Sequence, residues 1–177
     1  MSSEPMVRAV MFEALFLHGV RATEALEEAM RAEGVDLRAL KPEYPWVTYN
    51  RCVDLTWKHL FPDLSAEQGR RELGRAFVRG FTRTLLGGAV VAGQPVLGPA
   101  RYLKRFPDHL RLDSSRLRVT PIQVGERAFR MEFRNEIPVT PDFMVGVLEE
   151  GLRLTRTEAN FTVERHSPMS FDLHIAW

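Results

Sequence analysis

One stretch of the sequence repeats arginine at every fourth residue and could bind an anion. The four residues, which we call the arginine ridge, are Arg71, Arg75, Arg79 and Arg83. Steps of four residues drift by only about 40° around an α-helix, so the guanidinium groups should form one slanted row. Guanidinium groups hold oxyanions through paired hydrogen bonds, which suits phosphate, nucleic acid or an acidic protein partner. The alternative is a solvated helix face that the acidic parts of the same chain neutralise.

The distribution of charge argues against nucleic acid as the partner. The chain of 177 residues has 24 Lys and Arg, of which three are Lys, and a net charge of +1. Residues 66–111 carry a net charge of +6, whereas residues 1–65 carry −3 and residues 112–177 carry −2. With a net charge near zero and no aromatic stacking platform beside the ridge, an acidic protein partner fits better than a nucleic acid.

Residues that could perform catalysis or bind a metal show no recognisable pattern. The five histidines lack the i, i+4 spacing and the His-Glu-x-x-His motif of zinc sites, so we predict no metal. Cys52 lies within a predicted amphipathic helix, where a buried, inert thiol is the usual outcome. The Gly-x-Ser-x-Gly, Walker A and Gly-x-Gly-x-x-Gly motifs are absent. We therefore predict a non-enzymatic protein without a cofactor; the alternative is a small-molecule enzyme without a recognisable motif.

Five aromatic residues are candidates for an apolar binding site. They are Trp57, Phe77, Phe81, Phe143 and Phe161. We expect them to converge where helices meet a sheet, which is a common location for small-molecule pockets. They support a sensory or adaptor module that binds an apolar small molecule or docks a protein partner, and they leave a homodimer open. The alternative is that the aromatic rings only fill the core.

The first two-thirds of the chain has the patterning of helices. The predicted helices cover residues 3–17, 24–33, 45–61, 65–87 and 98–106. Ser65 and Gln68 form the strongest local signal, a capping box in which each side chain satisfies a backbone amide. Pro107 should end the last helix, Gly87-Gly88 should end or kink the one before it, and residues 93–95 should form a loop. For the first segment, a strand is the alternative.

After Asp113 the hydrophobic period changes from 3.6 to 2. Apolar side chains then alternate with polar ones over four segments, with a helix starting near Thr140 between the second and third. We predict an α+β fold in one domain over residues 1–177. Its helical part is residues 1–112, and residues 113–177 form a ββαββ unit with a four-stranded antiparallel sheet packed on helices.

Parity constrains the two hairpins, because paired residues in an antiparallel ladder share a face. In the last hairpin the apolar positions are all odd-numbered, so pairs sum to an even number and the loop near residues 166–168 has, most simply, three residues. In the first hairpin a two-residue turn at residues 125–126 would pair Ile122 with Phe129. That pairing requires a bulge near Thr120-Pro121.

Targeting signals are missing from the sequence. The apolar N-terminal stretch is interrupted by Glu13 and has no A-x-A-like cleavage site, so we predict no signal peptide. No window approaches the ~18–20 uninterrupted apolar residues of a membrane span. A single cysteine cannot form an intrachain disulfide, which fits a reducing compartment. We therefore expect a cytoplasmic protein.

Several strings resemble an uncharacterised protein family that is expanded in myxobacteria. They are Gly34-Val-Asp-Leu37 with Tyr44-Pro45, Leu73-Gly-Arg75 through Gly80-Phe-Thr-Arg-Thr84, Leu97-Gly-Pro-Ala-Arg101, Phe143-Met-Val-Gly146-Val-Leu148 and Phe171-Asp-Leu-His-Ile-Ala-Trp177. The likeness covers nearly the whole chain. Because the family has no established activity, the resemblance implies a bacterial source and little about function.

More remotely, helices followed by ββαββ resemble a ligand-sensing superfamily of heme nitric-oxide-binding domains, vinyl-reductase-like domains and trafficking-particle subunits. The resemblance implies a module that binds heme or an acyl chain, or that acts as an assembly subunit. The heme-binding members use a proximal His and a Tyr-x-Ser-x-Arg motif. The nearest string here is Tyr102-Leu-Lys-Arg105, which lacks the Ser spacing, so we carry over no heme ligand.

Overall fold

The computed structural model describes residues 4–92, 98–111 and 116–177. Ser3 and residues 93–95 of the sequence-based predictions lie outside these ranges. The N-terminal elements are β1 (Met6–Arg8), α1 (Ala9–Phe12), the π-helix η1 (Glu13–Gly19), α2 (Glu24–Ala32), β2 (Glu43–Pro45) and α3 (Trp46–Leu60). The middle elements are α4 (Ala66–Phe81), α5 (Leu85–Val91) and α7 (Pro99–Arg111). The C-terminal elements are β3 (Val119–Gly125), β4 (Ala128–Arg134), α8 (Pro141–Leu154), β5 (Asn160–Ser167) and β6 (Ser170–Ala176).

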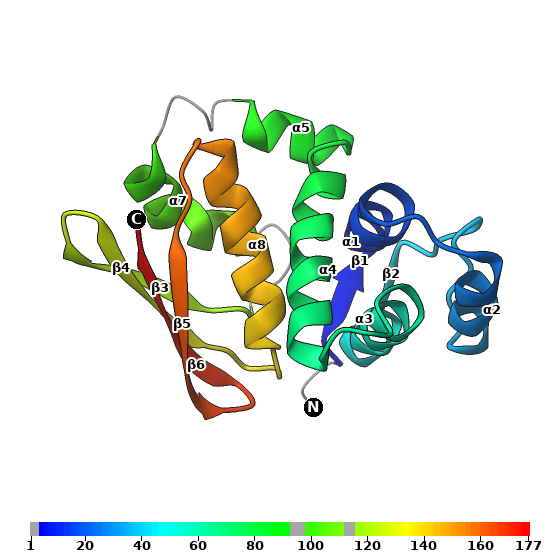
Figure 1. The fold of residues 1–177 in the computed structure, drawn as a ribbon. Helices are drawn as coiled ribbons and strands as arrows, with labels where there is room; N and C mark the ends of the chain where they lie inside the picture. The colour runs from blue at the N-terminus through cyan, green and yellow to red at the C-terminus, as the bar shows by residue number, and fades with distance from the viewer. Residues whose placement is uncertain (1–3, 93–97, 112–115) are drawn as a thin grey trace.

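The predicted α+β class is confirmed, with helices first and a ββαββ unit last. The sheet has the strand order β3-β4-β6-β5, and all its neighbours are antiparallel. In Figure 1, α8 lies between this sheet and α4, α7 lies beside the upper end of the sheet, and α1, α2 and α3 lie on the other side of α4. Buried side chains from one face of β4 and β6 form the centre of the core. They are Phe129, Met131, Phe133, Phe171, Leu173 and Ile175.

Local capping signals set several helix ends as predicted. The Thr23 hydroxyl accepts a hydrogen bond from the Leu26 amide at the start of α2, and Gly34 follows its end with φ of +83°. At α4, Ser65 and Gln68 form both hydrogen bonds of the capping box. These contacts involve residues two to four positions apart, so they can be predicted without knowing the tertiary structure.

Two helix ends were predicted wrongly, and the first segment combines its two alternatives. It begins with strand β1, which pairs with β2, and it becomes helical at Ala9. Helix α4 ends at Phe81, and Gly87 lies inside the new helix α5, where its amide donates to the Thr84 hydroxyl. Helix α7 continues through Pro107 to Arg111. Proline removes one helical hydrogen bond, but burial of one apolar face of α7 compensates for this loss.

The hairpin registers were predicted in part. In the last hairpin Phe161 pairs with Ile175 and further pairs also sum to an even number, as parity requires. A register shift between Arg165 and Ser167 replaces the predicted three-residue loop by a tighter turn with a bulge. In the first hairpin the irregularity lies between Gln123 and Gly125 and not near Thr120-Pro121, so Gln123 and not Ile122 pairs with Phe129. Moving the bulge towards the turn keeps the apolar faces aligned without disturbing Pro121.

Two glycines allow α4 and α8 to cross with their backbones in contact. A Cβ atom on Gly74 would lie 2.1 Å from the Phe143 carbonyl oxygen, and one on Gly146 would lie 2.0 Å from the Arg71 carbonyl oxygen. Both distances are far below van der Waals contact, so only glycine fits at either position. The close crossing brings the side chains that flank it on α4 and α8 against one another.

Among the described residues, none of the helices combines the length and apolar character that crossing a membrane demands.

Candidate functional site

A small apolar cavity lies where the helices meet the C-terminal sheet unit. Its volume is about 60 Å³. Side chains from α1, α3, α4, α7 and α8 form its walls, together with residues that flank the sheet. The lining residues that matter below are Met11, Trp46, Val53, Phe77, Phe143 and Met144. Its walls come from both parts of the chain, and its lining residues belong to helices and to the segments beside them; none of them belongs to a strand of the sheet.

Contacts between the helices hold the aromatic walls of the cavity. The indole nitrogen of Trp46 donates to the Pro138 carbonyl oxygen at 2.9 Å, which joins α3 to the segment before α8. The rings of Phe77 and Phe143 lie 5.9 Å apart across the α4–α8 pair. A molecule in the cavity would therefore contact the rings of Phe77 and Phe143.

The structure brings together only part of the predicted aromatic set. Phe77 and Phe143 line the cavity, and Phe81 stacks behind Phe77 with 5.9 Å between ring centroids. Trp57 packs over Gly69 at the α3–α4 contact, where a Cβ on Gly69 would be 3.0 Å from the Trp57 Cβ. Phe161 is half-buried on the edge strand β5, opposite Ile175. These positions separate Trp57 and Phe161 from the cavity.

Of the residues that line the cavity, the predicted set included only Phe77 and Phe143, and it missed Met11, Trp46 and Met144 among others. Trp46 lies at the start of the helix predicted over residues 45–61, and Met144 follows Phe143. Met11 lies on α1, whose position beside α3 follows from the pairing of β1 with β2. Nothing in the local sequence predicts that pairing.

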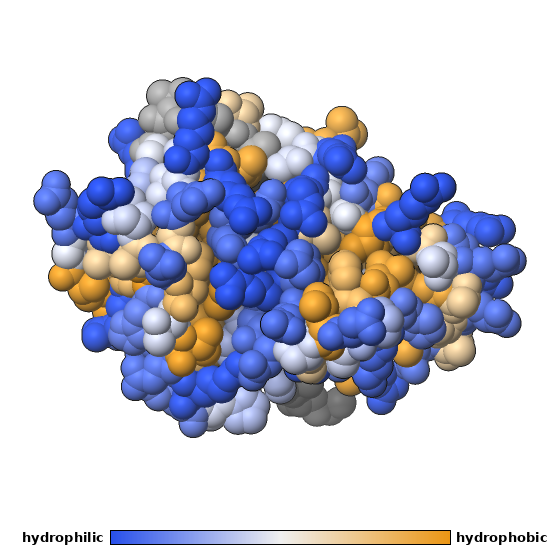
Figure 2. Space-filling view, in the orientation of Figure 1, coloured by the Kyte–Doolittle hydropathy of each residue, from blue (hydrophilic) through white to orange (hydrophobic). Residues whose placement is uncertain are grey.

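The arginine ridge meets carboxylates of α8 along most of its length. Arg71 Nε and Arg75 Nε donate to Glu149 Oε2 at 3.0 and 2.8 Å. Arg79 contacts Glu150 at 3.4 Å. The guanidinium of Arg83 donates to the His18 carbonyl oxygen at 3.0 Å. Figure 2 shows the resulting hydrophilic band over α4 and α8.

Glu149 is the acceptor at the centre of this network. Burial raises the pKa of Glu149. The hydrogen bonds and charges of Arg71 and Arg75 lower this pKa by more than burial raises it, so the net shift is downward. The carboxylate therefore stays ionised, with Arg71 Nε and both Nε and Nη2 of Arg75 against its Oε2 atom. Binding of an external acidic partner to the ridge stays a prediction, and such a partner would have to compete with Glu149.

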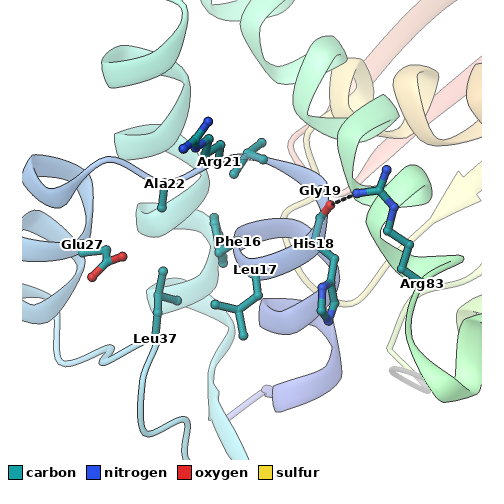
Figure 3. A pocket seen from close by; sticks show the side chains of 10 residues that line it. Phe16, Leu17, His18, Gly19, Arg21, Ala22, Glu27, Leu37 and Arg83 are labelled. Atoms are coloured by element: carbon teal, nitrogen blue, oxygen red, sulfur yellow. Dashed lines mark hydrogen bonds between the residues drawn. The ribbon is translucent and has the colours of Figure 1, made fainter.

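A second hollow lies beside the π-helix η1 and is shown in Figure 3. It is an open groove of about 460 Å³, with Phe16, Leu17 and Leu37 on its apolar floor and Arg21 and Arg83 among its charged groups. Leu17 is 44% exposed. This combination could bind a small molecule with an apolar part and an anionic group. Sequence periodicity did not predict the groove, because a π-helix does not follow the 3.6-residue period.

The groups most able to act as nucleophile or base are held in unreactive settings. Burial, with a contribution from Glu33, raises the pKa of the Cys52 thiol to about 12, which disfavours the reactive thiolate. Burial lowers the pKa of His109, whose ring lies 6.2 Å from that of Tyr102. Neither group lines the cavity at the junction. The cavity itself is suited to holding an apolar molecule rather than to acid–base chemistry.

Comparison with known proteins places the chain by family and by fold. The family model described as "Protein of unknown function (DUF2378)" matches residues 6–177. No curated protein matches the chain.

The fold matches solved structures of H-NOX proteins. The Fe(II) unliganded H-NOX protein from K. algicida superposes with a TM-score of 0.69 and 10% identity, covering 95% of this chain and 94% of that one. An oxygen-binding H-NOX domain related to soluble guanylate cyclases gives a TM-score of 0.68 and 15% identity, with 94% and 89% covered. A third structure, whose description concerns heme redox potential and porphyrin distortion, gives a TM-score of 0.68 and 15% identity, covering 95% of this chain and 96% of that one. At these identities the likeness establishes the fold.

Heme, which this fold implies, does not fit the residues present. Pockets that enclose drug-sized ligands measure roughly 300–1,000 Å³, and the cavity of about 60 Å³ is far smaller. None of its lining residues is His or Cys, which are common axial ligands. His109 lies away from it on α7, beside the buried ring of Tyr102. The core of α7 and the sheet is filled by the chain's own aromatic side chains.

We expect the purified chain to show no Soret band when it is expressed with excess heme precursor. Titration with hemin should give no saturable absorbance change, because the interior would have to expel several aromatic side chains to admit a porphyrin. An oxygen-binding H-NOX domain treated in parallel is the positive control. A saturable Soret band that disappears in His109→Ala would contradict this expectation and would make His109 an iron ligand.

Proposed function

Since the chain belongs to the DUF2378 family, a family of proteins of unknown function, we propose its function from the geometry of its site. The chain is a non-enzymatic sensory or adaptor module that holds a small apolar molecule in the cavity where α3, α4 and α8 meet. The observation that carries this proposal is the apolar cavity at the junction of α3, α4 and α8. The lone cysteine Cys52, which is buried and cannot form an intrachain disulfide, also favours a reducing compartment such as the cytoplasm.

The size of the cavity limits the ligand. A cavity needs a volume of roughly 10–15 Å³ to hold one water molecule, and an engineered apolar cavity of about 150 Å³ binds benzene or xenon. About 60 Å³ therefore suits a molecule of a few atoms or the end of an apolar chain. Met11 and Met144 in the walls are flexible side chains that could move to admit a larger group.

A ligand in this position has a direct route to the rest of the molecule. It would press on Phe77 and Phe143, which come from the two helices that also carry the arginine ridge and Glu149. A shift of one helix along the other would break or remake these ion pairs and would alter the surface available to a protein partner. One of the similar folds is described as an oxygen-binding H-NOX domain, and oxygen binding by that protein supports small-molecule binding in this fold.

Xenon is a suitable probe because it is apolar, monatomic and detectable by its NMR shift. We expect the wild-type chain to bind xenon with saturation, and Val139→Leu, which fills part of the cavity, to weaken binding about tenfold by removing contact volume. Val78→Leu, a substitution of the same size outside the lining, is the matched control. Native mass spectrometry of the freshly purified protein should in addition show a co-purified small molecule. Equal xenon binding by both variants, together with a clean apoprotein, would remove the cavity as a binding site.

A further inference from the structure

The outer face of the sheet carries three carboxylates in one row. Glu132 on β4 pairs with Asp172 on β6, and Asp172 pairs with Glu164 on β5. Residues that pair across antiparallel strands lie close together on one face, and like charges in such positions are destabilising. Each carboxylate in this row therefore needs a cation nearby.

Cations are unevenly distributed along this row. Arg130 contacts Glu132 at 2.9 Å, and Arg134 contacts Asp172 Oδ1 at 2.6 Å. On the β5 side the neighbours are imidazoles, with His166 Nε2 at 3.4 Å from Asp172 Oδ2 and His174 Nε2 at 3.2 Å from Glu164 Oε2. An imidazole carries a full charge only when it is protonated. Two carboxylates thus converge with a histidine. Within the described residues Glu164 forms its ion pair with His174, and the permanent charge of Arg134 acts on it only at longer range.

We propose that Glu164, His166 and Asp172 bind a divalent transition-metal ion, and that zinc is the ion they fit best. One ligand atom from each residue lies within 4.8 Å of the others. Zinc binds imidazole nitrogen and carboxylate oxygen at about 2.0–2.2 Å, which separates the ligands of a tetrahedral ion by roughly 3.3–3.6 Å. The 3.4 Å between His166 and Asp172 matches this separation. The pair would need little movement to share an ion.

Neighbouring groups orient both carboxylates as a metal site requires. Arg134 holds Asp172 Oδ1, which leaves Oδ2 on the side of His166. His174 contacts Glu164 Oε2 and restrains the other carboxylate. Such outer partners are typical of metal sites and fix the direction of each ligand. Asp172 is 7% exposed, whereas Glu164 and His166 are exposed, so an ion would have one anchored ligand and open positions for water.

The bulge in the β5–β6 hairpin explains why the sequence pattern did not reveal this group. The register shift between Arg165 and Ser167 falls at His166. Bulges redirect a side chain and are enriched beside functional sites. The histidine spacings alone predict no metal site, because His166 has no second histidine at ligand spacing. The structure instead joins one histidine with two carboxylates from paired positions.

The test is zinc binding by the whole chain after removal of metals with a chelator. Isothermal titration with zinc chloride should give one equivalent for the wild type, and zinc should raise Tm. His166→Gln should weaken binding by at least about 100-fold, and His174→Gln by about 10–100-fold through loss of an outer partner. His59→Gln, an exposed histidine on α3, should bind as the wild type does.

Two outcomes would overturn the proposal. One is the absence of zinc binding by a wild-type chain that unfolds cooperatively. The other is zinc binding that His166→Gln and Glu164→Gln leave unchanged. Both substitutions are at exposed positions, so circular dichroism should show the same fold for each variant. The result is independent of xenon binding, because the sheet's outer face does not line the junction cavity.

Discussion

Replacing Gly74 with alanine should destabilise the protein by about 3 kcal/mol. The new Cβ would lie 2.1 Å from the Phe143 carbonyl oxygen and 2.9 Å from the Val147 amide nitrogen. Both neighbours are backbone atoms of α8, so the helix itself must move. Overpacking of this kind typically costs about 1–3 kcal/mol and occasionally more, which exceeds the gain of about 1 kcal/mol from replacing glycine in a helix. Thermal unfolding should show Tm lowered by roughly 6–12 °C.

Gly88→Ala is the matched control for this substitution. Gly88 lies in α5, and a Cβ there would be 3.6 Å from the Thr82 carbonyl oxygen, which is ordinary contact. Its helix propensity gain should leave stability unchanged or raise it by about 0.5–1 kcal/mol. Gly146→Ala should resemble Gly74→Ala, since its Cβ would meet the Arg71 carbonyl oxygen at 2.0 Å. The double variant should cost less than the sum, because the first substitution already separates the helices. A fully stable Gly74→Ala protein would contradict the close crossing.

The second large effect should come from Glu149→Gln. The substitution removes the negative charge that accepts hydrogen bonds from Arg71 and Arg75. Hydrogen bonds to charged groups contribute about 1.5–3 kcal/mol, and the two guanidinium groups would lose their shared partner. We expect a loss of about 2 kcal/mol at pH 7, measured by urea unfolding. Glu136→Gln, which removes an exposed partner of Arg118, should change stability by less than about 0.5 kcal/mol.

The effect of Glu149→Gln should depend on pH in a defined direction. The pKa of Glu149 is lowered in the folded protein, so its ionised form stabilises the fold at pH values above the ordinary pKa of Glu, about 4.3. This stabilisation is lost as the pH falls through the lowered pKa. The difference between wild type and Glu149→Gln should therefore be largest near neutrality and should shrink progressively below about pH 4. A difference that grows on acidification would contradict the assigned role.

The sequence predicted the elements whose signals are local. The capping box at Ser65 and the amphipathic helix predicted over residues 45–61 depend on residues within one or two helical turns of each other. The even-numbered sums in the last hairpin followed from the alternation of the strands alone. The ends of α4 and α7 did not follow, because Thr84 starts a new helix and tertiary burial carries α7 past Pro107.

The candidate site was predictable only in outline. Phe77 and Phe143 were recognised as pocket residues, since each lies on the apolar side of an amphipathic helix. Arg71 and Arg75 of the arginine ridge are 78 and 74 residues away from Glu149 in the sequence. No spacing in the sequence indicates which carboxylates face the ridge. Neutralisation of the ridge by the same chain was one of the two alternatives, and the fold supplies the identity of the partners.

Strand β5 lies at an open edge of the sheet, and this position affects how the chain behaves at high concentration. An exposed edge can add a strand from another copy and so begin aggregation. Here the edge ends in a bulge at His166 and carries charged side chains, among them Glu164 and Arg165, the latter paired with Asp142. Bulges and charges on an edge oppose such strand addition. The bulge and the charged side chains that bring Glu164, His166 and Asp172 together thus also oppose the addition of a strand from another molecule.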